Sequence, residues 1–166
     1  MSKTQQPLAG RTALVTGASR GIGAAIAKRL ATDGANVIAH YGSGAEETKQ
    51  LVSQIETAGG RATAVQADLA SAQGPFELME RVAKQLGGGK LDILVNNAGL
   101  APFASTAEMT AESFDTLAAV NMRSVFFVTQ RALPLLADGG NIVNLSSLVT
   151  RTTFPGIPAY SATKGF

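Results

Sequence analysis

The sequence contains no cysteine and no tryptophan, and aromatic residues make up only 5% of it. Without cysteine the chain has no disulfide and no thiolate metal site, and no metal ligand set is predicted. It has no apolar run long enough to cross a membrane. It also has no cluster of basic residues, and its formal net charge is only +2. We therefore expect neither membrane insertion nor binding to nucleic acid.

The length of 166 residues fits one domain. The first ten residues are polar and lack the apolar centre of a signal peptide, so a cytoplasmic protein is expected. We predict a flexible tail over residues 1–10 and a single folded domain over residues 11–166.

The stretch from Thr12 to Gly23 has the pattern of a strand, a glycine loop and a helix. Three apolar residues are followed by Gly17, Gly21 and Gly23, and apolar residues then recur every four positions. Such a unit presents unpaired N–H groups and a partial positive charge to a diphosphate. The spacing G-x-x-x-G-x-G differs from the commoner G-x-G-x-x-G, so an ordinary glycine turn remains the alternative.

Four further stretches are typical of strands, at residues 36–40, 62–66, 91–95 and 141–145. Helical patterns alternate with them at about residues 44–58, 75–86, 111–118 and 121–137, and a last helix is expected near Ala159. Ser43 and Glu46 have the spacing of a capping box, and Pro134 is expected to kink its helix. The alternation predicts an α/β fold, a Rossmann-like doubly wound parallel sheet of order 3-2-1-4-5 in a three-layer αβα arrangement.

Polar and glycine-rich segments follow the predicted strands, at the edge of the sheet where a ligand is expected. They are the glycine loop, Asp68 with Leu69, the segment Asn96–Gly99, and Ser146 with Ser147. Beyond the last strand, Tyr160 and Lys164 are four residues apart and would share one face of a helix.

In this order and at these spacings, the sequence resembles the short-chain dehydrogenase/reductase family. It is closest to the single-domain subgroup with a TGxxxGxG loop and is similar to the 3-oxoacyl-carrier-protein reductases. The resemblance covers the chain after Gly10. It rests on Thr16, Gly17, Gly21, Ile22, Gly23, Asp68, Asn96, Asn97, Ala98, Gly99, Asn121, Ser147, Tyr160 and Lys164.

The resemblance implies an oxidoreductase that interconverts a carbonyl and a secondary alcohol. Tyr160 would exchange a proton with the substrate oxygen, and Ser147 would hydrogen-bond that oxygen. Lys164 would support Tyr160 and hold the nicotinamide ribose, and Asn121 would hold a water. The implied cofactor contacts come from Gly17, Ser19, Arg20, Gly21, Ile22, Gly23, Tyr41, Ser43, Asp68, Leu69, Asn96, Ala98, Gly99, Tyr160 and Lys164.

Several residues also have a purely structural interpretation. Asn121 could satisfy backbone groups at a helix bend, and Ser147 could form a turn at the end of a strand. Asn97 is expected to brace its turn rather than touch the substrate. His40, the only histidine, is interpreted as structural or as a contact at the rim of the cofactor site. The pair Phe126–Phe127 is interpreted as core or interface.

The predicted cofactor is NADP(H), with NAD(H) as the alternative. An NAD site usually has an acidic residue after the second strand, whereas here no acid precedes Glu46 and Tyr41 takes the usual acidic position. Arg20 is placed to pair with a 2′-phosphate. Apolar residues in the loops 100–104 and 148–158 favour an apolar carbonyl or alcohol substrate.

The family's domain continues past the tyrosine–lysine helix, so the sequence is expected to lack the family's C-terminal strands. Two functions compete on this basis. The chain is either an oxidoreductase that forms a homodimer or homotetramer when full length, or a truncated, inactive chain. A truncated, inactive chain would bind a dinucleotide or a partner without turnover.

Overall fold

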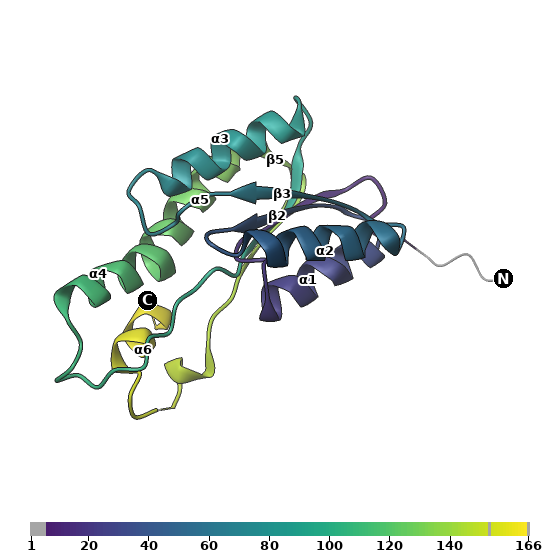
Figure 1. Ribbon diagram of the computed structural model, residues 1–166. Coiled ribbons are helices and arrows are strands. Elements are labelled where there is room, and N and C mark those ends of the chain that lie inside the picture. Colours follow the sequence, from purple (N-terminus) through teal and green to yellow (C-terminus); the bar gives the residue numbers. More distant parts are fainter. Residues whose placement is uncertain (1–5, 153, 166) are drawn as a thin grey trace.

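The computed structural model describes residues 6–152 and 154–165. Its centre is a five-stranded parallel sheet of order β3-β2-β1-β4-β5, which confirms the predicted topology (Figure 1). The strands are β1 (Thr12–Val15), β2 (Asn36–Tyr41), β3 (Arg61–Gln66), β4 (Leu91–Asn96) and β5 (Leu136–Asn144). β1 is short and central, and all three of its apolar side chains are completely buried.

Helices cover both faces of the sheet, as expected for parallel strands. One face carries α1 (Gly21–Thr32) and α2 (Ala45–Thr57), and the other carries α3 (Gly74–Leu86) and α5 (Ser124–Ala132) (Figure 1). The core accordingly has two halves, one around Leu14 and Leu78 and one around Val15 and Leu51. Adjacent residues of β1 serve opposite halves because side chains alternate along a strand.

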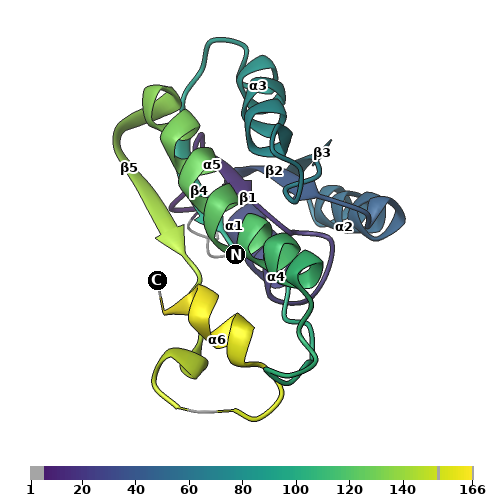
Figure 2. The same cartoon turned by 90° about the vertical axis from the view of Figure 1, so that its left-hand side faces the viewer.

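Two more helices lie beyond the carboxyl ends of the strands. They are α4 (Ala111–Ala118) and α6 (Pro158–Lys164), which contact each other (Figure 2). The helix expected near Ala159 is therefore present. A 3-10 turn, η3 (Leu148–Thr150), lies on the loop between β5 and α6 and also contacts α6.

The two helices predicted at 111–118 and 121–137 form one continuous helical stretch. A π-helical turn, η1 (Ala119–Arg123), joins α4 to α5, so the prediction of a separate helix starting at Asn121 is wrong. The stretch ends in a 3-10 turn, η2 (Leu133–Leu135), because Pro134 lacks the N–H that an α-helix needs. β5 then begins at Leu136, five residues before the predicted strand, and its pairing with β4 is irregular between Leu91 and Ile93.

The predicted capping box of α2 is also wrong. Gly44 is the N-cap, and no side chain caps the helix. Thr48 instead donates its hydroxyl to the Gly44 carbonyl at 2.7 Å. Gly44 packs so closely on Ser19 that a Cβ added there would lie 2.7 Å from the Ser19 Cβ, so the chain enters the helix through a glycine.

Residues 6–10 of the predicted tail form a turn whose Leu8 N–H donates to the Asp33 carbonyl, at 2.9 Å. The rest of that predicted tail, residues 1–5, lies outside the described residues. Within the described part of the chain, no helix is both long and apolar enough to cross a membrane.

A buried hydroxyl joins the ends of β1 and β4. Thr16 Oγ1 donates to the Val95 carbonyl at 3.3 Å and accepts the N–H groups of Asn97 and Ala98, each at 3.0 Å. One side chain thus fixes the chain direction after both strands, at the place where the glycine loop and the segment 96–99 separate.

Thr16→Val removes this hydroxyl while keeping the shape of the side chain. The substitution leaves the N–H groups of Asn97 and Ala98 without this acceptor. Leaving a buried donor without a partner costs roughly 1–3 kcal/mol, so we expect the free energy of unfolding to fall by about 2–3 kcal/mol. Urea denaturation measures it. Thr16→Ser keeps the hydroxyl and serves as the control. Equal stability of Thr16→Val and the wild type would contradict the importance of this junction.

Candidate active site

A cavity of about 630 Å³ opens at the carboxyl ends of β1, β2, β3 and β4. Its walls are the glycine loop, the turns after β2 and β3, the segment after β4, and Val120 of the π turn. Ten of the predicted cofactor residues line it: Gly17, Ser19, Arg20, Ile22, Gly23, Ser43, Asp68, Leu69, Ala98 and Gly99. This is the edge of the sheet at which the sequence predicted a ligand.

The N-terminus of α1 lines this cavity, and neither a capping side chain nor an acidic residue of the helix occupies its N–H groups. Its N-cap, Arg20, forms no capping bond through its side chain, and the first turn has no acidic residue. Gly21 has a φ of +56°, and a Cβ added there would meet open space. Free N–H groups, the helix dipole and a guanidinium together form a site that fits a diphosphate.

Two other loop glycines are required by close packing. Gly17 has a φ of +64°, and a Cβ there would lie 2.8 Å from the Ala98 Cα. A Cβ on Gly23 would lie 2.2 Å from the Gly17 carbonyl oxygen. Asn97 donates its side-chain amide to the carbonyls of Thr16 and Gly17, at 2.8 and 3.0 Å, so it braces the turn as expected.

His40 joins the ends of three strands. Its Nδ1 accepts the Gly17 N–H at 3.1 Å, and its Nε2 lies 3.1 Å from the Ala67 carbonyl, to which it donates in the matching neutral tautomer. Burial lowers the pKa of His40 to about 4, despite the opposing effect of the Ala67 carbonyl. The ring is therefore neutral near pH 7 and forms part of the cavity wall.

Five predicted cofactor residues are not among the residues that line the cavity: Gly21, Tyr41, Asn96, Tyr160 and Lys164. The Asn96 amide donates instead to Thr129 Oγ1 at 3.0 Å and to Asn144 Oδ1 at 2.8 Å. These partners belong to α5 and β5. Cofactor contacts of all five residues remain predictions.

The buried Asn121 side chain ties together two segments near the cavity. Its Oδ1 accepts the Leu100 N–H at 2.9 Å, and its Nδ2 donates to the Leu100 carbonyl at 2.9 Å and to Thr163 Oγ1 at 3.0 Å. The Asn121 side chain thus satisfies backbone groups, but these belong to the loop after β4 and not to a helix bend. A role in holding a water remains a prediction.

Of the other catalytic candidates, Lys164 lies close to Asn121 near the segment that follows β4. A Cβ added at Gly99 would lie 3.4 Å from Asn121 Oδ1 and 3.8 Å from Lys164 Nζ. Lys164 Nζ donates to the Leu145 carbonyl at 2.9 Å, and burial lowers the pKa of its ammonium group. Ser147 is the N-cap of η3 and accepts the Val149 N–H at 3.4 Å. Because η3 contacts α6, the segment with Ser147 lies beside the helix that carries Tyr160 and Lys164.

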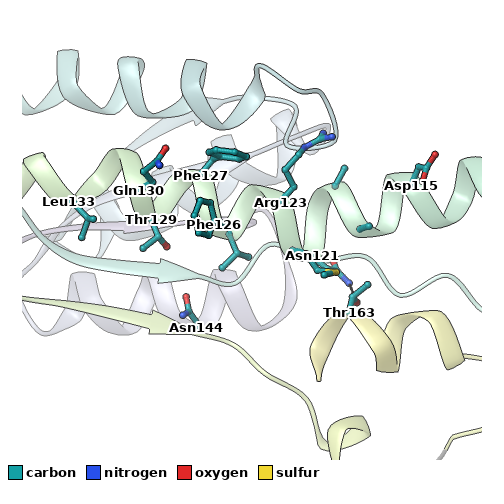
Figure 3. A pocket seen from close by; sticks show the side chains of 14 residues that line it. Asp115, Asn121, Arg123, Phe126, Phe127, Thr129, Gln130, Leu133, Asn144 and Thr163 are labelled. Carbon is teal, nitrogen blue, oxygen red and sulfur yellow. Dashed lines mark hydrogen bonds between the residues drawn. The ribbon is translucent and has the colours of Figure 1, made fainter. Parts of the chain in front are cut away.

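A larger groove of about 1100 Å³ runs along α5 toward β5 and α6 (Figure 3). Among the predicted site residues it includes only Asn121. Phe127 packs on Phe76, with ring centroids 5.2 Å apart, whereas Phe126 is 63% exposed. We assign the candidate cofactor site to the smaller cavity, because that one contains the glycine loop and the helix N-terminus. None of the four predicted catalytic residues, Asn121, Ser147, Tyr160 and Lys164, lines it.

Reasoning from the sequence missed three contributors to this site. They are the Thr16 hydroxyl, the backbone of Leu100 and the Thr163 hydroxyl. The position of Thr163 directly before Lys164 was the only available signal, and its partner Asn121 lies 42 residues earlier in the chain.

Residues 11–166 match the family model described as short chain dehydrogenase. The chain belongs to the short-chain dehydrogenase family. Two curated relatives illustrate the similarity. An uncharacterized oxidoreductase of Methylorubrum extorquens is 46% identical over 158 residues, which are 95% of this chain and 63% of that protein. The hydroxynaphthalene reductase arp2 of Aspergillus fumigatus is 37% identical over 161 residues, 97% of this chain and 58% of that protein.

Solved structures agree with this membership. The angucycline C-6 ketoreductase LanV with bound NADP superposes with a TM-score of 0.92 and is 46% identical; the match covers 95% of this chain and 63% of LanV. The landomycin C-6 ketoreductase LanV with NADP and rabelomycin gives a TM-score of 0.90 at 45% identity, covering 95% and 66% of the two chains. This chain thus spans less than two thirds of the length of these relatives.

The lowered pKa of His40 makes folding depend on pH. The unfolded state has the ordinary pKa of 6.5 and the folded state about 4, so the unfolded state binds more protons between these values. The contribution of His40 to the free energy of unfolding is therefore complete above about pH 6.5. It falls by roughly 3 kcal/mol between about pH 6.5 and pH 4.

Urea denaturation between about pH 7 and pH 4 measures this dependence. In His40→Gln, which has no imidazole left to titrate, we expect a lower stability at neutral pH and a shallower loss on acidification. Identical pH slopes for the two proteins would show that His40 is not the titrating group.

Proposed function

We propose that this chain carries the cofactor-binding and catalytic residues of an NADP(H)-dependent oxidoreductase that interconverts a carbonyl compound and a secondary alcohol. The observation that carries the proposal is the convergence at one sheet edge. The uncapped N-terminus of α1 with Arg20 lines the cavity together with Gly99, and Asn121 and Lys164 lie next to Gly99. Family membership and the NADP bound to LanV support the same conclusion.

The chemical roles follow from the residue types. When bound, the reduced nicotinamide supplies the hydride. Tyr160 donates the proton to the carbonyl oxygen in reduction, and Ser147 donates a hydrogen bond to that oxygen as its negative charge develops. The Lys164 ammonium favours the charged form of the Tyr160 hydroxyl after proton transfer and would contact the nicotinamide ribose.

NADP(H) is preferred over NAD(H) in this proposal. Arg20 and Ser43 line the cavity next to the end of β2, where a 2′-phosphate would lie. A guanidinium can pair with that phosphate through charge-assisted hydrogen bonds. No acidic residue between the end of β2 and Glu46 would repel it.

An apolar, aromatic carbonyl compound is the proposed substrate class. Large apolar side chains are exposed on the loops after β4 and β5, and Phe103 is 84% exposed. The two loops are joined, because the Ala104 N–H donates to the Gly156 carbonyl at 2.7 Å. The relatives include a hydroxynaphthalene reductase, which supports an aromatic substrate, and LanV is called a ketoreductase, which supports a carbonyl substrate.

A homodimer or homotetramer is part of the same proposal. The resemblance to the family favours assembly through the helical stretch that carries Asn121 and through the tyrosine–lysine helix. Phe126 of α5 and Leu133 of η2 are exposed along the larger groove. Exposed large apolar side chains grouped on one surface are typical of protein interfaces.

Dinucleotide preference can be tested by fluorescence titration with NADPH and NADH. We expect NADPH to bind at least about tenfold more tightly, since a charge-assisted pair contributes roughly 1.5–3 kcal/mol. Arg20→Ala should remove most of this difference, and Tyr41→Asp should reverse it by repelling the 2′-phosphate. Lys28→Ala, which removes an equal charge from an exposed position on the same helix, is the control. Equal affinities for both dinucleotides in the wild type would exclude this role of Arg20.

The role of Tyr160 can be tested by Tyr160→Phe, which removes only the hydroxyl. We expect kcat for ketone reduction to fall by about 100-fold or more, which is the usual contribution of a positioned acid. The dissociation constant of NADPH should stay within about twofold, since the ring is kept. Steady-state rates and titration measure the two quantities. A variant that keeps most of its kcat would remove Tyr160 from the mechanism.

A further inference from the structure

We propose that Thr163 is a positioning residue, whose hydroxyl fixes the helix of Tyr160 and Lys164 to the π turn of Asn121. The inference rests on the proposed function, because it assigns Thr163 to the placement of the two catalytic candidates on either side of it. Figure 3 shows Thr163 on α6 next to Asn121, to which it is hydrogen-bonded.

The Thr163 hydroxyl is used fully and is shielded from water. Its Oγ1 accepts the Asn121 Nδ2–H at 3.0 Å and donates to the Tyr160 carbonyl at 2.8 Å. Thr163 is 4% exposed and Asn121 is 5% exposed. The hydroxyl therefore links the backbone of the tyrosine to a side chain on another element, in surroundings where water cannot replace the bond.

Asn121 is itself a rigid partner. Its amide also holds both backbone groups of Leu100, so it joins the loop after β4 to α6 through Thr163. The π turn that presents Asn121 has its own stabilising bonds. The Ser124 N–H donates to the Ala119 carbonyl, five residues back, and the Ser124 hydroxyl donates to the Val120 carbonyl at 2.7 Å. In a regular α-helix the Ser124 N–H would donate to the Val120 carbonyl. In the π turn the Ser124 hydroxyl donates to that carbonyl instead, so the carbonyl keeps a hydrogen-bond partner.

α6 needs such a tether. It has seven residues and no side chain that caps its N-terminus, and helices of this length are not stable without tertiary contacts. Its Ser161 hydroxyl bonds only to Ile157, next to the same helix. Lys164 bonds to Leu145, but that ammonium is also the group proposed to contact the cofactor. Thr163 is thus the polar anchor of α6 that takes no part in the chemistry.

The test compares Thr163→Val, which keeps the shape and removes the hydroxyl, with Thr163→Ser, which keeps the hydroxyl. An aryl ketone such as 1-tetralone and NADPH are the probes. We expect kcat to fall about tenfold or more in Thr163→Val, because misplaced catalytic groups lose rate at constant binding. KM for the ketone should change by less than about threefold. Thr163→Ser should stay within about twofold of the wild-type kcat.

Ser161→Ala is the matched control, since it removes a hydroxyl of the same helix that makes no bond to the π turn. Thr163→Cys is a second variant, and its weak thiol hydrogen bonds should give an intermediate kcat. A wild-type kcat in Thr163→Val, or an equal loss in Thr163→Ser, would overturn the proposal.

Amide hydrogen exchange over residues 158–165 separates this inference from the proposed function. Without any ketone or NADPH, exchange should be faster in Thr163→Val than in the wild type and unchanged in Thr163→Ser and Ser161→Ala. Equal exchange in all four proteins would overturn the tether. A wild-type protein that neither binds NADPH nor reduces ketones, but shows these exchange differences, would contradict the proposed function alone.

Discussion

The candidate site depends on the hydrogen-bonded junction between the ends of β1 and β4. These neighbouring strands continue into loops that must separate to leave room for a ligand, and separation exposes backbone N–H and C=O groups. Thr16 and Asn97 satisfy those groups with side chains, on opposite sides of the gap. Polar bonds inside the sheet edge therefore keep the cavity open where continued strand pairing would close it.

Much of the fold could be predicted because its signals are local. The apolar runs of β1, β2, β3 and β4 and the intervening helical periodicity gave the strand order observed. The glycine loop was recognisable for the same reason, since its three glycines and the helix after them are adjacent in sequence. The neutral His40 fitted a structural interpretation because an isolated histidine at a strand end has no catalytic partner nearby in sequence.

The errors lie where tertiary contacts outweigh local preference. Nothing local distinguishes a π turn from the end of one helix and the start of another, so the sequence of Ala119–Arg123 was divided wrongly. The cap of α2 was misassigned because Ser43 and Glu46 have the spacing of a capping box, whereas Gly44 is the N-cap and packs closely on Ser19. The partners of the Asn96 amide, Thr129 and Asn144, were not predicted, because they lie 33 and 48 residues later in the chain.

The π turn also limits how the long helix can vary. A π turn contains one residue more than the α-helical path it replaces, so deleting one residue there would restore a regular helix. Everything after the deletion would then turn by about 100° about the helix axis. Val128, now in the core, would leave the sheet, and the exposed Phe126 would change its direction. The extra residue therefore sets the rotation between the two halves of the helical stretch. With it, the first half directs Asn121 toward the candidate site, and the second half directs Val128 into the core against the sheet.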